Sequence, residues 1–220
     1  MIIVLQNVLS AEDLSHLREA IPKLTFEDGQ ERTGHAAAMV KYNRQAVPDS
    51  PGLAPLQALV TSALQRDVLF QLAAMPLRVL PPIFSSYETG MEYGEHTDDA
   101  LIGPIRTDMS LTVFLSDPNS YDGGELIIES STGYNDIKLP AGDAVLYPAT
   151  AIHRVAPVTR GERLAAVTWI QSSVRDSARR ELVFELDMTR RSLLAQQGKT
   201  RDFDTLSKCH ANLLRMWADA

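Results

Sequence analysis

Residues 93–103, YGEHTDDALIG, place a histidine and an aspartate two positions apart between glycines. In an extended strand, residues two apart project to the same side, so His96 and Asp98 can converge on one point while Thr97 faces away. An imidazole nitrogen and a carboxylate oxygen are both ligands that metals accept. This pair is common by chance, so its surroundings must decide whether it binds a metal.

A third ligand is available at His153, in the stretch PATAIHRVAPV. It opens a strand-like run that an antiparallel sandwich can lay beside the first. Two histidines and one carboxylate on one face of a metal, with the opposite positions open, form the triad of non-haem Fe(II) oxygenases. Asp99 is the rival carboxylate, but strand alternation directs it to the other side, which favours a solvated turn residue.

Such an iron site makes a further demand on the sequence. Fe(II) with one carboxylate ligand keeps a positive charge and accepts a bidentate 2-oxo acid, and a dicarboxylic one such as 2-oxoglutarate leaves its far carboxylate inside the protein. An arginine fork binds that carboxylate best, because it offers two parallel hydrogen bonds and stays charged when buried. Arg163, in TRGERLAAVTW, follows His153 by ten residues. The spacing of Arg163 is equally compatible with an ordinary surface salt bridge.

The segments that must position these residues form an all-β block over residues 77–175. Short runs rich in β-branched, aromatic and leucine residues alternate with clusters of Gly, Pro, Asn and Asp. The runs include MSLTVFLS, ELIIES, DAVLYP, HRVAPV and LAAVTWIQ. No helix-length pattern separates them, which argues against parallel βαβ units and for an antiparallel sandwich, jelly roll or barrel.

Helical patterns flank this block on both sides. Residues 1–76 contain a capping-box signal at Ser10 and Asp13 and a second amphipathic run in LAPLQALVTSAL, which predicts an N-terminal helical support region. Residues 176–220 predict a C-terminal helical hairpin with a stop at Gly198. His210 lies on the apolar stripe of the last helix and is expected at a core or rim position.

Composition excludes several classes of protein. The chain of 220 residues has a formal net charge of −7 and no basic block, which argues against a nucleic-acid-binding face. Its one cysteine excludes an internal disulfide and a zinc site built on cysteines, and fits a reducing compartment. No apolar run approaches the roughly 18 residues of a membrane span, and the first residues lack a signal-peptide pattern. We therefore expect a cytoplasmic protein that does not bind a membrane.

Beyond these separate features, long motifs resemble one known family. HTD, the distant His153 and Arg163 resemble the Fe(II)/2-oxoglutarate dioxygenase superfamily. The stretches VLSAEDLSHLREAI, EDGQERTGHAAAMVKYNRQ, YGEHTDDALIG, IRTDMSLTVFLSDPNSYDGGEL and LPAGDAVLYPATAIHRVAPVTRGERLAAVTWIQSSVRD are similar to the bacterial, iron-uptake-associated PKHD-type hydroxylases. The resemblance covers almost the whole chain and implies a double-stranded β-helix core with helices at both ends.

The resemblance also implies a set of site residues and cofactors. Fe(II) is expected on His96, Asp98 and His153, 2-oxoglutarate on Arg163, and L-ascorbate as a helper that re-reduces the iron. Tyr87 matches a tyrosine that faces the 2-oxoglutarate pocket in relatives, although an aromatic residue there can equally fill the barrel. Arg106 is expected in an ion pair with Asp108 at the mouth of the site, with substrate contact as the other interpretation.

The expected function is that of a dioxygenase that couples decarboxylation of 2-oxoglutarate, giving succinate and CO₂, to hydroxylation of a C–H substrate by O₂. That substrate is a small molecule or an amino-acid side chain, and the sequence does not name it. The alternative is a non-catalytic iron-binding β-sandwich that serves as a sensor or store; a zinc hydrolase on a cupin-like barrel is a further rival. A homodimer is possible through the C-terminal stripe, and residues 28–45, with His35 and Asn43, form a polar loop that can cover the site.

Overall fold

The computed structural model describes residues 1–32 and 35–219. Its helices are α1 (Ala11–Ala20), α2 (His35–Ala38), α3 (Leu53–Arg66), α4 (Val68–Ala74), α5 (Ser177–Gln197) and α6 (Arg201–Trp217), with short 3₁₀ helices at Ile21–Lys23 and Gly29–Arg32. Its strands are β1 (Ile3–Leu5), β2 (Phe26–Asp28), β3 (Lys41–Tyr42), β4 (Arg44–Ala46), β5 (Pro76–Val79), β6 (Ile83–Glu88), β7 (Glu92–His96), β8 (Leu101–Ile102), β9 (Ile105–Arg106), β10 (Met109–Phe114), β11 (Asp122–Gly123), β12 (Leu126–Ser130), β13 (Gly133–Ile137), β14 (Ala144–Pro148), β15 (His153–Val155), β16 (Val158–Arg160) and β17 (Glu162–Ser172).

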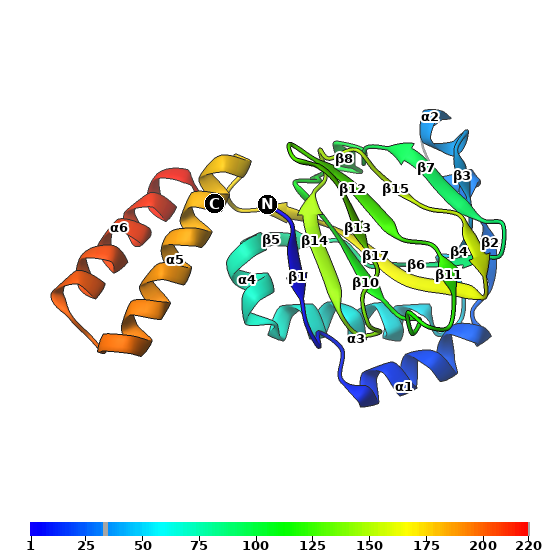
Figure 1. Cartoon of the computed structure of the whole chain (residues 1–220), viewed down its shortest axis with the longest axis horizontal. Coiled ribbons are helices and arrows are strands. Elements are labelled where there is room, and N and C mark those ends of the chain that lie inside the picture. Colours follow the sequence, from blue (N-terminus) through cyan, green and yellow to red (C-terminus); the bar gives the residue numbers. More distant parts are fainter. Residues whose placement is uncertain (33–34, 220) are drawn as a thin grey trace.

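Two antiparallel sheets face each other to form the core of the molecule (Figure 1). The larger sheet has the order β1-β14-β10-β17-β6-β4-β2, with β5 also paired to β17, and the smaller has the order β13-β12-β15-β7-β3. Apart from the β12–β13 hairpin, neighbouring strands in these sheets are not consecutive in the chain, as in a jelly roll. This is the predicted double-stranded β-helix.

Strand β10 shows how the larger sheet divides two cores. Its odd-numbered residues, Met109, Leu111 and Val113, join the cluster packed with the N-terminal helices. Its even-numbered residues face the smaller sheet, where Phe114 joins a second apolar cluster. Because alternate strand residues point to opposite faces, one strand supplies both layers, and its polar residues Ser110 and Thr112 are placed inside the barrel.

The N-terminal segment supports the larger sheet with helices. Side chains of α3 that recur at helical spacing, including Leu56, Val60 and Leu64, are buried in the helix-side core, and α3 runs along the outer face of the larger sheet (Figure 1). The segment is less purely helical than predicted, because it also provides β1, β2, β3 and β4. These strands have two or three residues each, too short for a clear alternating pattern in the sequence.

The C-terminal segment forms the predicted helical hairpin of α5 and α6, which projects from one end of the barrel (Figure 1). Asp187 is buried on α5, where its carboxylate binds Arg190 and Arg191 and lies 3.7 Å from His210 Nε2. Burial alone would raise the pKa of Asp187, but hydrogen bonds from Arg191 and Arg190 leave that pKa lowered. His210 is thus a rim residue of the hairpin, as expected.

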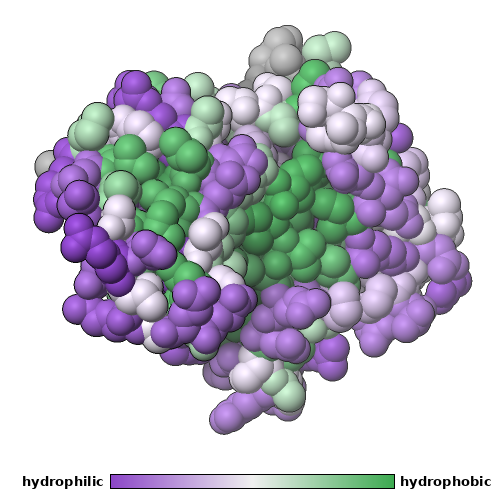
Figure 2. Space-filling view, turned by 60° about the vertical axis from the view of Figure 1, so that its left-hand side comes forward, coloured by the Kyte–Doolittle hydropathy of each residue, from purple (hydrophilic) through white to green (hydrophobic). Residues whose placement is uncertain are grey.

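The hairpin has a weaker core than the barrel. No described residue of α6 is fully buried, whereas all six residues of β10 are. Figure 2, which brings the hairpin side forward, shows apolar surface in patches framed by hydrophilic residues. Within the described residues, no helix has both the length and the apolar composition needed to cross a bilayer.

Candidate active site

The structure brings His96, Asp98 and His153 together at one end of the barrel. His96 ends β7 and His153 begins β15, and the antiparallel pairing of these strands sets the two histidines opposite each other. Their ring centroids are 4.2 Å apart, and His153 Nε2 lies 3.8 Å from Asp98 Oδ2. One potential ligand atom from each residue falls within 4.8 Å of the others, a separation that a single metal ion can bridge.

Backbone carbonyls orient both imidazoles. His96 Nδ1 is 2.8 Å from the Gly94 oxygen, and His153 Nδ1 is 3.0 Å from the Ala151 oxygen. A carbonyl oxygen only accepts hydrogen bonds, so each Nδ1 carries a proton, and in the neutral ring Nε2 is then the nitrogen with the free lone pair. This is the arrangement by which outer-shell groups fix the tautomer of metal-binding histidines.

The carboxylate of Asp98 is held by Ser110, whose hydroxyl donates to Asp98 Oδ2. Ser110 belongs to the inward face of β10, so the opposite sheet orients this candidate ligand. The neighbouring Asp99 is exposed and uses its backbone oxygen to accept a hydrogen bond from Thr107 Oγ1. Its carboxylate is outside the cluster of the three candidate ligands, in line with the strand alternation read from the sequence.

The environment keeps His96 neutral. Burial, reinforced by the neighbouring His153, lowers the pKa of His96 from 6.5 to about 4. At neutral pH its Nε2 is therefore unprotonated, which is the form that binds a metal.

A cavity of about 390 Å³ opens between the two sheets and contains all three residues in its wall. The larger sheet contributes Tyr87, Thr112, Tyr147, Arg163 and Trp169, and the smaller contributes Tyr93, Leu126 and Val155. Leu101, Ile102 and Gly103 also line the cavity, and the 62% exposure of Leu101 places this segment at the mouth. The size is suitable for small ligands, and the wall combines apolar and aromatic side chains with polar and charged groups that can orient a ligand.

Arg163 lies in the wall of this cavity and is 1% exposed. Its guanidinium carbon is 5.2 Å from the ring of Tyr87, its cross-strand partner on β6, and 5.4 Å from the ring of Phe114. Among the described residues, its Nε and Nη2 have no hydrogen-bond partner. The interpretation of Arg163 as a surface salt-bridge residue is therefore wrong, since the side chain is buried and lines the same cavity as the candidate ligands.

Residues of the N-terminal segment also line the cavity. Lys41 and Gln45, on β3 and β4, are nearly buried there, and Ala37 lies in the same wall. Burial is the main cause that lowers the pKa of Lys41 to about 8. The sequence predicts residues 28–45 only as a loop that can cover the site. The stretch VKYNRQ does place polar residues at alternate positions, as a strand with one face toward the cavity would, but strands of two or three residues are too short for this alternation to be recognised. Asn43 is buried, and the side chain of His35 lies outside the described residues.

Arg106 is placed differently from the other predicted site residues. It forms the expected ion pair with Asp108, with Nε donating to Oδ1 at 2.7 Å. The cavity wall, however, does not include Arg106, whose guanidinium points toward the base of the helical hairpin. The structure thus brings five of the six predicted site residues to one cavity and leaves the substrate contact of Arg106 without support.

Comparison with known families matches this arrangement. The model of the 2OG-Fe(II) oxygenase superfamily matches residues 82–171, which carry the candidate triad and Arg163. The model of the PKHD-type hydroxylase C-terminal domain matches residues 176–219, which form α5 and α6.

Relatives with curated names are similar over their full length. A PKHD-type hydroxylase of Crocosphaera subtropica is 48% identical over 222 residues, and one of Hyphomonas neptunium is 47% identical over 226 residues. In both comparisons the match covers 100% of each chain.

Solved structures share the fold at low sequence identity. A prolyl hydroxylase from Trichoplax adhaerens, in complex with a hypoxia inducible factor peptide fragment, aligns with a TM-score of 0.60 at 13% identity, covering 82% of this chain and 86% of its own. A Pseudomonas putida prolyl-4-hydroxylase aligns with a TM-score of 0.53 at 19% identity, covering 78% and 92%. Similarity at this level establishes the jelly-roll fold alone.

Proposed function

The chain belongs to the PKHD-type hydroxylases of the 2OG-Fe(II) oxygenase superfamily and is thus a 2-oxoglutarate-dependent dioxygenase. On this basis we propose that His96, Asp98 and His153 hold the iron. We further propose that Arg163 binds the far carboxylate of 2-oxoglutarate. The observation that carries the proposal is the position of the buried Arg163 in the wall of the same cavity as the three candidate ligands.

The donor set suits Fe(II). Two imidazoles and one carboxylate provide two nitrogen ligands and one oxygen ligand from one side and leave the other side open to co-substrate. The carbonyl partners of His96 and His153, together with Ser110 on Asp98, hold the ligand atoms in place before the metal arrives. A site organised in this way loses little entropy on binding.

The opposite region of the cavity suits a carboxylate. Nitrogen atoms of Arg163 that lack protein partners can donate two parallel hydrogen bonds to it. The rings of Tyr87 and Phe114 confine the guanidinium and exclude water around it, which strengthens the charge interaction. We assign Tyr87 to this 2-oxoglutarate pocket for the same reason.

When bound, iron with 2-oxoglutarate and O₂ supplies the oxidant that converts a substrate C–H into C–OH, while the co-substrate becomes succinate and CO₂. The chain's own residues contribute geometry. The triad orients the metal, Arg163 sets the position of the co-substrate, and the enclosing sheets keep the cavity poor in water. The primary substrate enters past Leu101 and Ile102, at the mouth.

Other parts of the expected function stay predictions. L-ascorbate as a reductant follows from the family resemblance, a cytoplasmic location and the absence of nucleic-acid partners follow from composition, and a homodimer follows from the apolar stripe of the last helix. The rival iron sensor or store would use the same triad but would not need a buried arginine in the cavity, so Arg163 is the residue that separates the two functions.

The proposal is tested without knowledge of the primary substrate. The metal-free protein is titrated anaerobically with Fe(II) and then with 2-oxoglutarate, and the visible metal-to-ligand charge-transfer band of a chelated 2-oxo acid is recorded. We expect a saturable band in the unmodified protein and in His16→Ala, whose side chain is exposed on α1, and no band in His153→Ala. Iron binding with no band, and no succinate after O₂ is admitted, would favour the sensor or store.

A further inference from the structure

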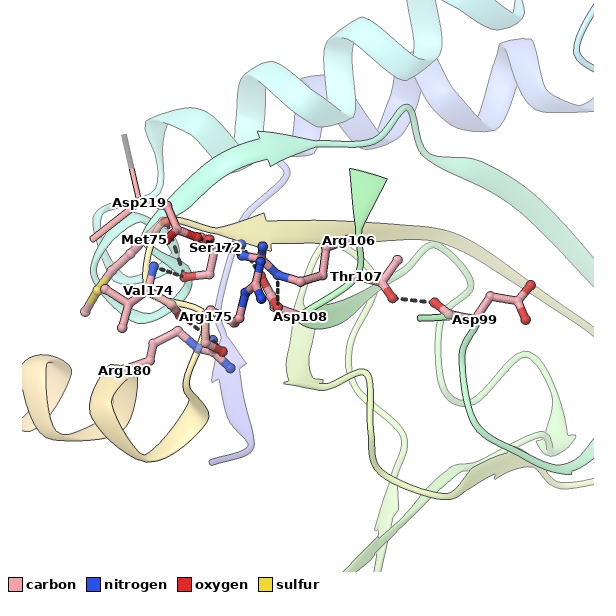
Figure 3. A network of polar contacts seen from close by, with 10 residues as sticks. All are labelled: Met75, Asp99, Arg106, Thr107, Asp108, Ser172, Val174, Arg175, Arg180 and Asp219. Carbon is pink, nitrogen blue, oxygen red and sulfur yellow. Dashed lines mark hydrogen bonds and ion pairs between the residues drawn. The ribbon is translucent and has the colours of Figure 1, made fainter. Parts of the chain in front are cut away.

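A polar network joins the base of the helical hairpin to the barrel, with Arg106 at its centre (Figure 3). Arg106 ends β9, and its side chain is 18% exposed. Its Nε donates to Asp108 Oδ1 at 2.7 Å, while its Nη2 donates to the Ser172 oxygen at 3.1 Å and lies 3.4 Å from Asp219 Oδ2. One guanidinium therefore contacts the start of β10, the end of β17 and the segment after α6.

The partners of Arg106 are themselves fixed to the barrel. The second oxygen of Asp108 accepts a hydrogen bond from the Ser172 backbone at 2.8 Å, and the Asp108 backbone donates to the Ile170 oxygen at 2.9 Å. Asp108 is 7% exposed in its side chain, so this pair is shielded from solvent. A partly buried, doubly anchored ion pair holds its geometry better than an exposed one.

The C-terminal hairpin is attached to the same point. The Asp219 backbone donates to the Ser173 oxygen at 2.7 Å, which returns the end of α6 to the barrel beside Arg106. Within α5, the buried Arg180 donates to the backbone oxygens of Val174 and Arg175 in the connecting segment. Both ends of the hairpin are thus tied to the region where β17 ends.

The other side of Arg106 leads to the cavity. Strand β9 pairs with β8, setting Leu101 opposite Arg106, and Leu101 lies at the cavity mouth. The next residue, Thr107, donates its backbone N–H to the Ala100 oxygen at 3.1 Å and its hydroxyl to the Asp99 oxygen. Asp99 directly follows Asp98, the candidate carboxylate ligand. Residues 98–107 therefore form a closed loop, and Arg106 lies at its stem, where the loop leads into β10, rather than at the turn of residues 103–104.

We propose that Arg106 is a positioning residue through which the C-terminal hairpin holds the mouth hairpin β8–β9 and the loop carrying Asp98 in their working geometry. The inference rests on the proposed function of Asp98 as an iron ligand. In this role Arg106 acts through the loop and does not contact the substrate. The C-terminal domain then contributes to the active site although it does not line the cavity.

The physical reason is the weakness of the mouth hairpin by itself. Two strands of two residues each form few ladder hydrogen bonds, and isolated two-stranded hairpins are marginal in water. Residues 99–101 are exposed and have little packing to hold them. A fixed ion pair at the stem of the hairpin restricts local opening. Outer-shell groups that orient a ligand typically change metal affinity or activity by about 10- to 100-fold.

Hydrogen exchange tests the positioning directly in the full chain. Arg106→Gln removes all three contacts, Asp219→Asn weakens only the hairpin arm, and Arg160→Gln is the matched control. Arg160 likewise binds a carboxylate, Asp122, and a backbone oxygen, but in the two-stranded sheet β11–β16, whose residues do not line the cavity. We expect amide exchange in residues 98–107 to rise about 10-fold in Arg106→Gln and less in Asp219→Asn, with residues 126–137 unchanged and Arg160→Gln like the unmodified protein.

A second measurement separates this inference from the proposed function. In the anaerobic titration, Arg106→Gln should bind Fe(II) about 10-fold more weakly, while 2-oxoglutarate affinity at saturating Fe(II) stays within about twofold, because Arg163 is untouched. Arg106→Lys, which keeps the charge, should recover part of the loss. Exchange and Fe(II) affinity equal to those of Arg160→Gln would overturn the positioning role. A missing charge-transfer band in the unmodified protein would instead overturn the proposed function, with the exchange result still deciding whether Arg106 holds the loop.

Discussion

The two polar ends of the cavity are built in opposite ways. At the mouth end, the candidate metal ligands come from β7, the loop after it and β15, and the two histidines face each other across a strand pair of the smaller sheet. At the other end, Arg163 and Tyr87 face each other across a strand pair of the larger sheet and are almost completely buried. The mouth end gathers two imidazoles and the carboxylate of Asp98, with Lys41 in the same cavity wall, whereas the buried end presents the guanidinium of Arg163.

This difference explains what the cavity can bind. A metal ion needs lone pairs at short range and open positions for exchange, which residues at the edge of a barrel provide. A carboxylate needs a fixed cation in a medium of low dielectric constant, which only the interior provides. A ligand with one metal-chelating end and one carboxylate end satisfies both regions at once.

The largest expected effect comes from breaking the metal end. Asp98→Ala should reduce succinate release from 2-oxoglutarate by more than about 100-fold, because even groups that only orient a metal ligand cost about 10- to 100-fold. The matched change Asp99→Ala should leave succinate release near its original rate, since that side chain is exposed and outside the cluster. The reverse pattern would show that Asp99 is the ligand.

Changing the buried end should weaken co-substrate binding without removing iron. In Arg163→Lys a single ammonium replaces the guanidinium fork, and a loss of about 2 to 3 kcal/mol corresponds to about 30- to 150-fold in 2-oxoglutarate affinity. The measurement is the 2-oxoglutarate concentration that half-saturates the charge-transfer band. Fe(II) affinity should be nearly unchanged, so equal losses for both ligands would mean that the two ends are not independent.

A smaller effect is expected at Tyr87, which confines Arg163 from the side. Tyr87→Leu keeps the volume partly filled but removes the ring beneath the guanidinium, at a cost of about 1 kcal/mol, or about fivefold in 2-oxoglutarate affinity. Tyr87→Phe retains the ring and should bind nearly as well. If Tyr87→Phe alone causes the full loss, the hydroxyl rather than the ring is the important group.

The pH dependence of the metal-free protein sharpens the contrast at the mouth end. The pKa of His96 is lowered to about 4 in the folded state against 6.5 in a free side chain, so the unfolded chain takes up this proton first as pH falls. The free energy of unfolding should therefore decrease between pH 6.5 and 4. Thermal unfolding of His96→Gln should show a smaller decrease over this range, whereas His16→Gln, changed at an exposed site, should behave like the unmodified chain.

Part of the fold could be predicted because its signals are local. The β-branched and aromatic runs of β10 and β17, the capping box at Ser10 and the stop at Gly198 each appear within a few consecutive residues, and the structure contains the corresponding elements. The four short N-terminal strands were missed for the converse reason. Strands of two or three residues gain their stability from pairing with β6, β7 and β14, and such pairing leaves no period in the sequence.

The same distinction applies to the candidate site. His96 and Asp98 could be found from their spacing, and His153 and Arg163 from the chemistry that an iron site requires. Lys41, Gln45 and Ser110 could not, because a lysine, glutamine or serine has no distinctive spacing and becomes part of a site only when packing turns it inward. Arg106 was found as an ion pair, but its position between the helical hairpin and the mouth emerged only from the structure.

By itself, the sequence determined which side chains are available for metal and carboxylate binding, since ligand chemistry depends on residue type and strand periodicity. Only the tertiary structure decided that Arg163 is buried in the cavity wall, that the N-terminal segment completes that wall, and that the C-terminal hairpin is tied to the loop of Asp98. Those contacts join residues far apart in the chain, and their geometry depends on how two sheets and a helical hairpin pack together rather than on any local pattern.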